Sequence, residues 1–274
     1  MSTDGQTALP AFDTIRLEMS GAVARLTLNR PQRLNAAPPR MFDEIRAALA
    51  LLPGLGARAL LIAGEGRAFC SGADLAERGS GEFAELSGGA RASHVLRHSY
   101  APTMRALAEL DIPVVTAVTG AAAGIGCSLA LAADFTVAAR SAYFLEAFVN
   151  IGLVPDGGAT WMLPRQIGKA RAAQMLMLGE RVGAEQAEQW GLIYKAVDDA
   201  ELHETALALA QRLANGPTRA LGMIRQGIAR ALEQPYAEAL AMEAAHQHRA
   251  GDSADAAEGI AAFAQKRPTA FKGR

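Results

Sequence analysis

Features that would point to a nucleic-acid-binding or disulfide-stabilised protein are scarce in this sequence. Only 2 of its 274 residues are cysteine, too few for a disulfide framework or a zinc site built by cysteines alone. Aromatic residues make up only 5%, and 27 basic against 28 acidic side chains leave a net charge of −1. Proteins that bind nucleic acid usually carry a basic surface and aromatic residues that stack on bases. We therefore expect no nucleic-acid partner.

Long apolar runs and metal-ligand patterns are missing as well. No run approaches the ~18 residues of a membrane-spanning helix, and residues 1–13 lack the apolar segment of a secretory signal. His94 and His98 share a helical face without the H-E-x-x-H pattern, and His246 and His248 point to opposite sides of a helix. We expect a cytoplasmic protein with no metal site and no membrane association.

Strand and helix patterns alternate over the first three quarters of the chain. The alternating segment 13–28 predicts a β-hairpin, and the apolar runs 58–63 and 112–118 predict buried strands. Alternation of helices with such strands is typical of parallel strands joined by right-handed crossovers. We expect an α/β core over residues 1–198. The pattern of residues 199–274 is helical throughout, and this region should pack on the core or on another subunit.

Glycine is the residue type in excess, with 27 of 274 residues. Of these, 9 lie in residues 54–89 and 6 in residues 120–158. Two small-residue turns stand out there, 68–75 after a strand and 121–129 from a strand into a helix. If the two turns meet, their N–H groups could form an oxyanion hole, in which each donor contributes roughly 3–4 kcal/mol of transition-state stabilisation. Glycine spacing alone leaves a second interpretation, two tight corners without a catalytic role.

The second turn also partly matches two other motifs. Residues 126–130 approximate the G-x-S-x-G nucleophile elbow around Ser128, but alanine replaces the second glycine and no histidine follows within the α/β core. Residues 124–129 match only half of the dinucleotide-binding fingerprint. Cys70 and Cys127 lie inside the two turns without a neighbouring histidine, which favours small buried thiols over nucleophiles.

One carboxylate stands in a distinctive setting. Asp156 lies between an apolar run and two glycines, in the segment 151–161. It could cap the helix that follows. The local pattern favours the cap, and the second interpretation is a general acid or base beside an apolar pocket.

Together these segments resemble the crotonase superfamily, the enoyl-CoA hydratases and isomerases, over nearly the whole chain. The resemblance implies a spiral of ββα units and a C-terminal helical region that builds homotrimers or dimers of trimers. The motifs agree with the family in order and spacing; they span residues 28–36, 66–75, 112–120, 129–134, 152–155, 184–192 and 262–267.

The resemblance also implies a binding site for an acyl-CoA, which enters as the substrate thioester and not as a separate cofactor. Backbone N–H groups would hold the thioester oxygen, one from Ala73 and one from Ile125, with a one-residue uncertainty towards Gly124 or Gly126. Asp74 would shape the loop around coenzyme A. The remaining expected contacts are Ser71 and Leu75 at the adenine, Arg33 at the phosphates, and Phe263 and Lys266 from a neighbouring subunit.

This sequence departs from the hydratases of the family at both of their catalytic glutamates, where it has Ser128 and Phe148. Neither side chain exchanges a proton at neutral pH, so hydration should be poor. Asp156 occupies the acid/base position of the family's isomerases, among them those acting on Δ3-enoyl-CoAs or on the phenylacetyl-CoA epoxide of phenylacetate degradation. Glu146 is a reserve candidate, ranked lower because it precedes the loop. We therefore expect an acyl-CoA isomerase whose acyl chain is covered by residues 76–92; the alternatives are an enoyl-CoA hydratase and a non-catalytic acyl-CoA-binding protein.

Overall fold

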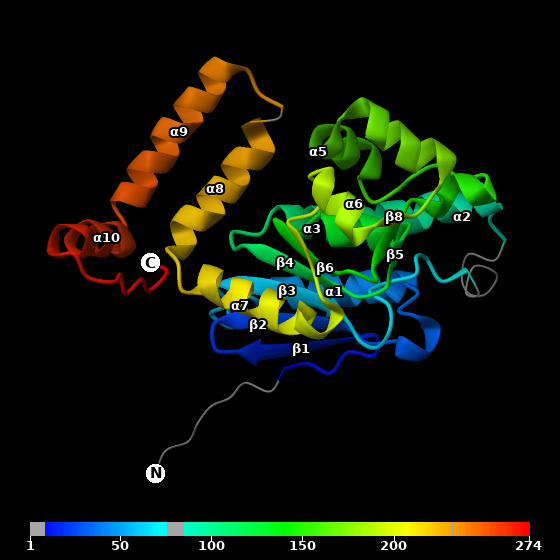
Figure 1. The fold of residues 1–274 in the computed structure, drawn as a ribbon, viewed down its shortest axis with the longest axis horizontal. Coiled ribbons are helices and arrows are strands. Elements are labelled where there is room, and N and C mark those ends of the chain that lie inside the picture. Colours follow the sequence, from blue (N-terminus) through cyan, green and yellow to red (C-terminus); the bar gives the residue numbers. More distant parts are fainter. Residues whose placement is uncertain (1–8, 76–84, 232) are drawn as a thin grey trace, which may run out of the picture.

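Two β-sheets form the framework of the protein (Figure 1). The structure, a computed structural model, describes residues 9–75, 85–231 and 233–274. Its larger sheet has the strand order β1-β2-β3-β4-β6-β9 and its smaller sheet the order β5-β7-β8. The strands are β1 (Ile15–Ser20), β2 (Val23–Leu28), β3 (Ala59–Gly64), β4 (Val114–Val118), β5 (Ala121–Ala123), β6 (Phe135–Ala139), β7 (Tyr143–Leu145), β8 (Val182–Gly183) and β9 (Lys195–Val197).

The larger sheet confirms the predicted hairpin and the predicted parallel strands. β1 pairs with β2 in antiparallel register, with Ser20 opposite Val23. Gly21, at φ +61°, therefore opens a two-residue turn that suits a hairpin. From β2 to β9 every neighbouring pair in the sheet is parallel. β3 and β4 are almost wholly buried, as expected for parallel strands covered on both faces.

Helices cover the sheets, and the helical pattern expected for residues 199–274 is confirmed by α7 to α10. A π-helical stretch (Leu96–Tyr100) connects α2 to α3, so the chain is helical from Gly88 to Ala108. Part of the loop expected over 76–92 lies outside the described residues. The helices are α1 (Pro39–Leu51), α2 (Gly88–Val95), α3 (Ala101–Ala108), α4 (Ile125–Leu131), α5 (Ala159–Ala173), α6 (Ala184–Gln189), α7 (Leu202–Ala214), α8 (Thr218–Ala231), α9 (Tyr236–Gly251) and α10 (Ala254–Gln265).

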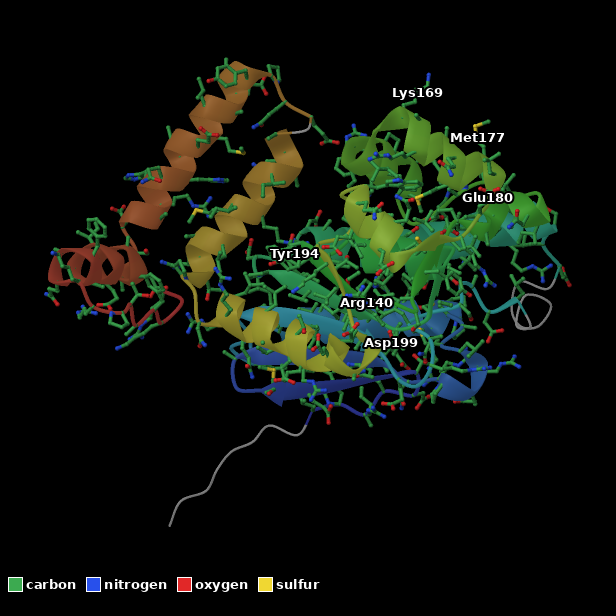
Figure 2. All side chains as sticks on the ribbon, viewed as in Figure 1. Arg140, Lys169, Met177, Glu180, Tyr194 and Asp199 are labelled. Carbon is green, nitrogen blue, oxygen red and sulfur yellow. The ribbon has the colours of Figure 1, made fainter. Side chains whose placement is uncertain are left out.

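Helix α7 lies across the larger sheet and contacts β3 and β4 (Figure 1). Its buried residues, Leu202, Ala206, Ala210 and Ala214, recur every four residues and form one face of the helix. Three of the four are alanines, which allow the helix backbone to approach the strands closely. Where the chain enters α7, Figure 2 shows Arg140 and Asp199 near each other. The carboxylate of Asp199 accepts hydrogen bonds from Ser141, which joins the end of β6 to the start of α7.

The last three helices project from this core (Figure 1). Arg225 of α8 attaches these helices to the core. Its guanidinium donates hydrogen bonds to the carbonyls of Leu107, Ala108 and Leu110 and to the carboxylate of Asp134. α9 has no buried residue. The division of the chain at residue 199 remains a prediction. In the structure α7 packs on the sheet, so only α8, α9 and α10 stand apart. Within the described residues no helix is long and apolar enough to cross a membrane.

Candidate active site

The two small-residue turns lie side by side. Cys70 donates its N–H to the carbonyl of Ala121 at 3.0 Å, and Ala123 donates to the carbonyl of Cys70 at 2.9 Å. The start of α4 packs directly against the first turn, because a Cβ at Gly126 would lie 2.6 Å from the carbonyl oxygen of Cys70. Residue 126 must therefore be glycine for the turns to meet in this way.

The first turn presents the N–H of Ala73. Its neighbours are fixed by Ala37, which donates to the carbonyl of Gly72 at 2.8 Å and accepts from the N–H of Asp74 at 3.0 Å. In the part of the chain that the structure describes, no acceptor receives the N–H of Ala73. Gly72 has φ +107°, a conformation that L side chains rarely adopt. The turn therefore leaves one backbone donor available for a ligand.

The second turn presents the N–H groups that open α4. Gly124, at φ +51°, donates its own N–H to the carbonyl of Leu145 at 2.8 Å, which removes it from the three candidate donors. Ile125 is the first residue of α4, and its N–H has no acceptor among the described residues. A Cβ at Gly124 would lie 3.9 Å from the Cα of Gly72. The two turns thus lie next to each other at the positions expected to hold the thioester oxygen.

Asp156 lies on a turn that packs on the same helix. The hydroxyl of Ser128 donates to the backbone carbonyl of Asp156 at 3.0 Å. A Cβ at Gly157 would lie 2.6 Å from both the Cδ1 of Ile125 and the Cβ of Ser128. The N-cap residue of α5 is Gly158, without a side-chain hydrogen bond, so the helix-cap interpretation of Asp156 is not supported. Asp156 is half-buried, and the turn that carries it lies beside the start of α4.

Ser128 and Phe148, expected in place of the two hydratase glutamates, both line this region. Ser128 is fully buried and its hydroxyl is engaged with the Asp156 carbonyl. The ring of Phe148 lies 3.5 Å from where a Cβ of Gly124 would stand. Neither residue supplies a group that titrates near neutral pH.

Glu146 lies closer to Asp156 than its place in the sequence suggested. Its side chain is completely buried, and neither carboxyl oxygen receives a hydrogen bond of normal geometry within the described residues. Burial raises the pKa of Glu146 to about 8; the facing thiol of Cys127 lowers it and the charge of Asp156 raises it further. Although Glu146 precedes the loop, its carboxyl group is within electrostatic reach of Asp156. Its rank below Asp156 as the acid/base remains a prediction.

The residues expected around coenzyme A gather at the rim of the first turn. The buried carboxylate of Asp74 forms ion pairs with Arg30 at 2.9 Å and Arg33 at 3.6 Å. Ser71 and Leu75 are exposed beside it. Arg30 was not among the predicted site residues, although it lies inside the motif at residues 28–36. This rim presents an exposed guanidinium, that of Arg33, to an anionic ligand.

Phe263 and Lys266 lie away from the two turns of the same subunit. Both are exposed on or just after α10, which Figure 1 places on the opposite side of the protein from β5 and α2. Their predicted role, as contacts from a neighbouring subunit, remains a prediction. Among the described residues no group of histidine, cysteine and acidic side chains could hold a metal ion.

Comparison with known sequences settles the family. The profile of the "Enoyl-CoA hydratase/isomerase" family matches residues 18–274. The chain belongs to the enoyl-CoA hydratase/isomerase family. A protein from Rhodobacter capsulatus described as a probable enoyl-CoA hydratase is 45% identical over 264 residues, covering 96% of this chain and 100% of that protein. The 1,2-epoxyphenylacetyl-CoA isomerase of Escherichia coli K12 is 43% identical over 256 residues, covering 92% and 95%.

Solved structures confirm the family's fold for this chain. The enoyl-CoA hydratase of Bacillus anthracis superposes with a TM-score of 0.88 at 28% identity, covering 96% of this chain and 100% of the other. An enoyl-CoA hydratase from Polaromonas gives a TM-score of 0.85 at 34% identity, covering 94% and 99%. The crotonase-type α/β spiral with a C-terminal helical region, expected from the resemblance, is therefore confirmed.

Proposed function

We propose that this family member is an acyl-CoA isomerase in which Asp156 is the acid/base. The observation that carries the proposal is the fixed turn of Asp156 on helix α4, next to the N–H groups of Ala73 and Ile125. Ser128 and Phe148 offer no second titrating group of the kind that a hydratase needs to activate water. The proposal is thus a reaction without water, in which a proton moves within the substrate.

In the proposed reaction, the thioester oxygen accepts hydrogen bonds from the N–H groups of Ala73 and Ile125. Asp156 removes a proton from a carbon next to the thioester, and the electron pair of that bond moves onto the oxygen as an enolate. Asp156 then returns the proton to another position. Each oxyanion donor contributes roughly 3–4 kcal/mol, and general acid–base catalysis adds roughly 10²–10⁴-fold.

Two substrates fit this chemistry, an epoxide of phenylacetyl-CoA and a Δ3-enoyl-CoA. The 43% identity to a protein named 1,2-epoxyphenylacetyl-CoA isomerase favours the epoxide. The 45% identity to a protein described as a probable enoyl-CoA hydratase keeps hydration as the alternative. Against hydration stands the hydroxyl of Ser128, which is hydrogen-bonded to the Asp156 carbonyl where a hydratase is expected to carry a carboxylate.

We further propose that the protein is a homotrimer, or a dimer of trimers, in which coenzyme A lies between Arg33 of one subunit and Phe263 and Lys266 of the partner subunit. The support is the separation of α10 from the two turns within one subunit, together with the 88% exposure of Phe263. Light scattering would measure the assembly. Phe263→Ala should raise KM for acyl-CoA and leave kcat unchanged.

The deciding experiment compares the wild type with Asp156→Asn on crotonyl-CoA, 3-enoyl-CoAs and the phenylacetyl-CoA epoxide. We expect isomerisation of one of the last two, and its loss in the variant with unchanged affinity for the CoA ester. An active Asn variant would refute the role of Asp156. Rapid hydration of crotonyl-CoA would favour the hydratase, and the absence of any turnover or proton exchange would favour a non-catalytic binding protein.

A further inference from the structure

Glu146 is a completely buried carboxyl group in a setting that does not suit a charge. It lies between β7 and the 3-10 segment Ala147–Ile151, and neither oxygen receives a normal hydrogen bond within the described residues. A buried carboxylate without compensating donors is strongly unfavourable, so such a group usually stays neutral by keeping its proton. The titratable groups that face it are Cys127 of α4 and Asp156 of the neighbouring turn. The thiol of Cys127 favours the charged form of Glu146, whereas burial, the larger effect, and the charge of Asp156 disfavour it.

Asp156 differs from Glu146 in its surroundings. It is half-buried, on a turn fixed by the hydroxyl of Ser128, and one of its carboxyl oxygens is fully buried, whereas both oxygens of Glu146 are. Two carboxyl groups within electrostatic reach in a dry site do not both ionise readily, because each charge disfavours the other. The proton of such a pair resides on the group with the poorer solvation, which here is Glu146.

We propose that Glu146 keeps a proton at neutral pH and so limits the pair to a single negative charge, carried by Asp156. This inference rests on the proposed role of Asp156 as the base. When Asp156 accepts the substrate proton, the electron pair of the broken C–H bond becomes the enolate charge, and Glu146 keeps its proton throughout. The site then holds one negative charge before and after the step. Glu146 acts through Asp156 and is a positioning residue.

The inference has a consequence for the pH profile of the reaction. Ionisation of Glu146 gives the pair a second negative charge, which opposes the formation of the enolate. The rate should therefore fall as the pH rises through about 8, the value to which burial raises the pKa of Glu146. Glu146→Gln, which has the shape of the protonated acid but does not ionise, should lack this alkaline decline.

Two measurements test the proposal. The first needs no turnover: the infrared spectrum of the wild type should show the carbonyl band of a protonated carboxylic acid that disappears as the pH rises through about 8, and Glu146→Gln should lack it. Absence of the band in the wild type would overturn the proposal whatever the substrate is. Because the wild type alone shows the titration, the measurement remains decisive if the variant folds poorly.

The second measurement follows exchange of the α-protons of butyryl-CoA in deuterated water by NMR. We expect exchange by the wild type to fall about tenfold per pH unit above the transition, and exchange by Glu146→Gln to stay level over the same pH range. An inactive Glu146→Gln would make Glu146 itself the base, and parallel pH profiles would give it a purely structural role; either result overturns the proposal. Asp156→Asn, run beside it, tests the proposed function separately, because exchange in that variant would remove Asp156 as the base and leave the infrared result standing.

Discussion

The buried carboxyl group of Glu146 makes the stability of the folded protein depend on pH, and Glu146→Gln should remove that dependence. The unfolded chain exposes Glu146 at its ordinary pKa of 4.5, whereas burial raises the folded-state pKa to about 8. Between these two values the unfolded chain has released the proton that the folded protein still holds. Raising the pH therefore favours unfolding, with the stabilisation complete below 4.5 and lost as the pH rises through 8.

The size of the effect follows from the shift. A separation of 4.5 and about 8 is about 3.5 pH units, and each unit corresponds to about 1.4 kcal/mol. The wild type should thus lose on the order of 5 kcal/mol from this group between the two pH values, against a total stability of about 5–15 kcal/mol for a typical domain. Glu146→Gln should not lose this stability, so the free energy of unfolding of the variant should rise relative to that of the wild type as the pH increases.

Urea unfolding at fixed protein concentration, from below pH 4.5 to above pH 8, measures this difference. Glu44 offers a matched control with the opposite sign: burial raises its pKa, but hydrogen bonds from Thr14 and Asp13 and the charge of Arg40 lower the pKa overall. Glu44→Gln should therefore destabilise at neutral pH, and its effect should vanish on acidification. Equal pH dependence in the wild type and Glu146→Gln would show that Glu146 titrates like an exposed glutamate and would refute the reasoning.

Three further predictions concern the packing of the two turns, the burial of the two thiols and the attachment of α8 to the core. Gly126→Ala places a Cβ 2.6 Å from the Cys70 carbonyl; it should reduce the free energy of unfolding by about 1–3 kcal/mol and slow α-proton exchange, whereas Gly88→Ala, with open space around it, should do neither. Cys70 and Cys127 are fully buried with raised pKa values, mainly from burial, so a thiol reagent should label both only after denaturation, and rapid labelling of the native protein would contradict this. Arg225→Gln removes donors to three carbonyls and a carboxylate and should destabilise by about 2–3 kcal/mol in a urea titration; a change within experimental error would show that α8 is held by other contacts.

Much of the fold could be predicted from local pattern. The hairpin, the buried parallel strands and the C-terminal helices each carry a periodicity that extends over several residues. β5 does not, because its three alanines, Ala121–Ala123, have no strand preference and form a strand by pairing with β7 and with Cys70 of the first turn. α7 shows an amphipathic pattern, but that pattern does not say whether the apolar face meets the sheet or other helices.

Some residues of the candidate site could also be predicted from local pattern, and others could not. The two turns and Asp156 could be predicted because their residues lie in short contiguous motifs that resemble the family's. The setting of Glu146 could not be predicted, because the groups that perturb its pKa come from α4 and from the turn of Asp156, and no sequence pattern reports that they converge. Arg30 was missed for a related reason, since its ion pair with Asp74 spans 44 residues.

The proposed donors to the thioester oxygen belong to the peptide backbone, and this has a consequence for how the protein can change over evolutionary time. Substitution at Ala73 or Ile125 alters a side chain and leaves the N–H in place. The positions that constrain the backbone are the neighbouring glycines, 72 and 124, whose positive φ values few other residues adopt. New acyl-CoA specificities could therefore be acquired by replacing side chains such as those at 128, 148 and 156, while the polarising apparatus is inherited intact. A library randomised at the partly buried positions 148 and 156 should yield many folded variants, and one randomised at the glycines few.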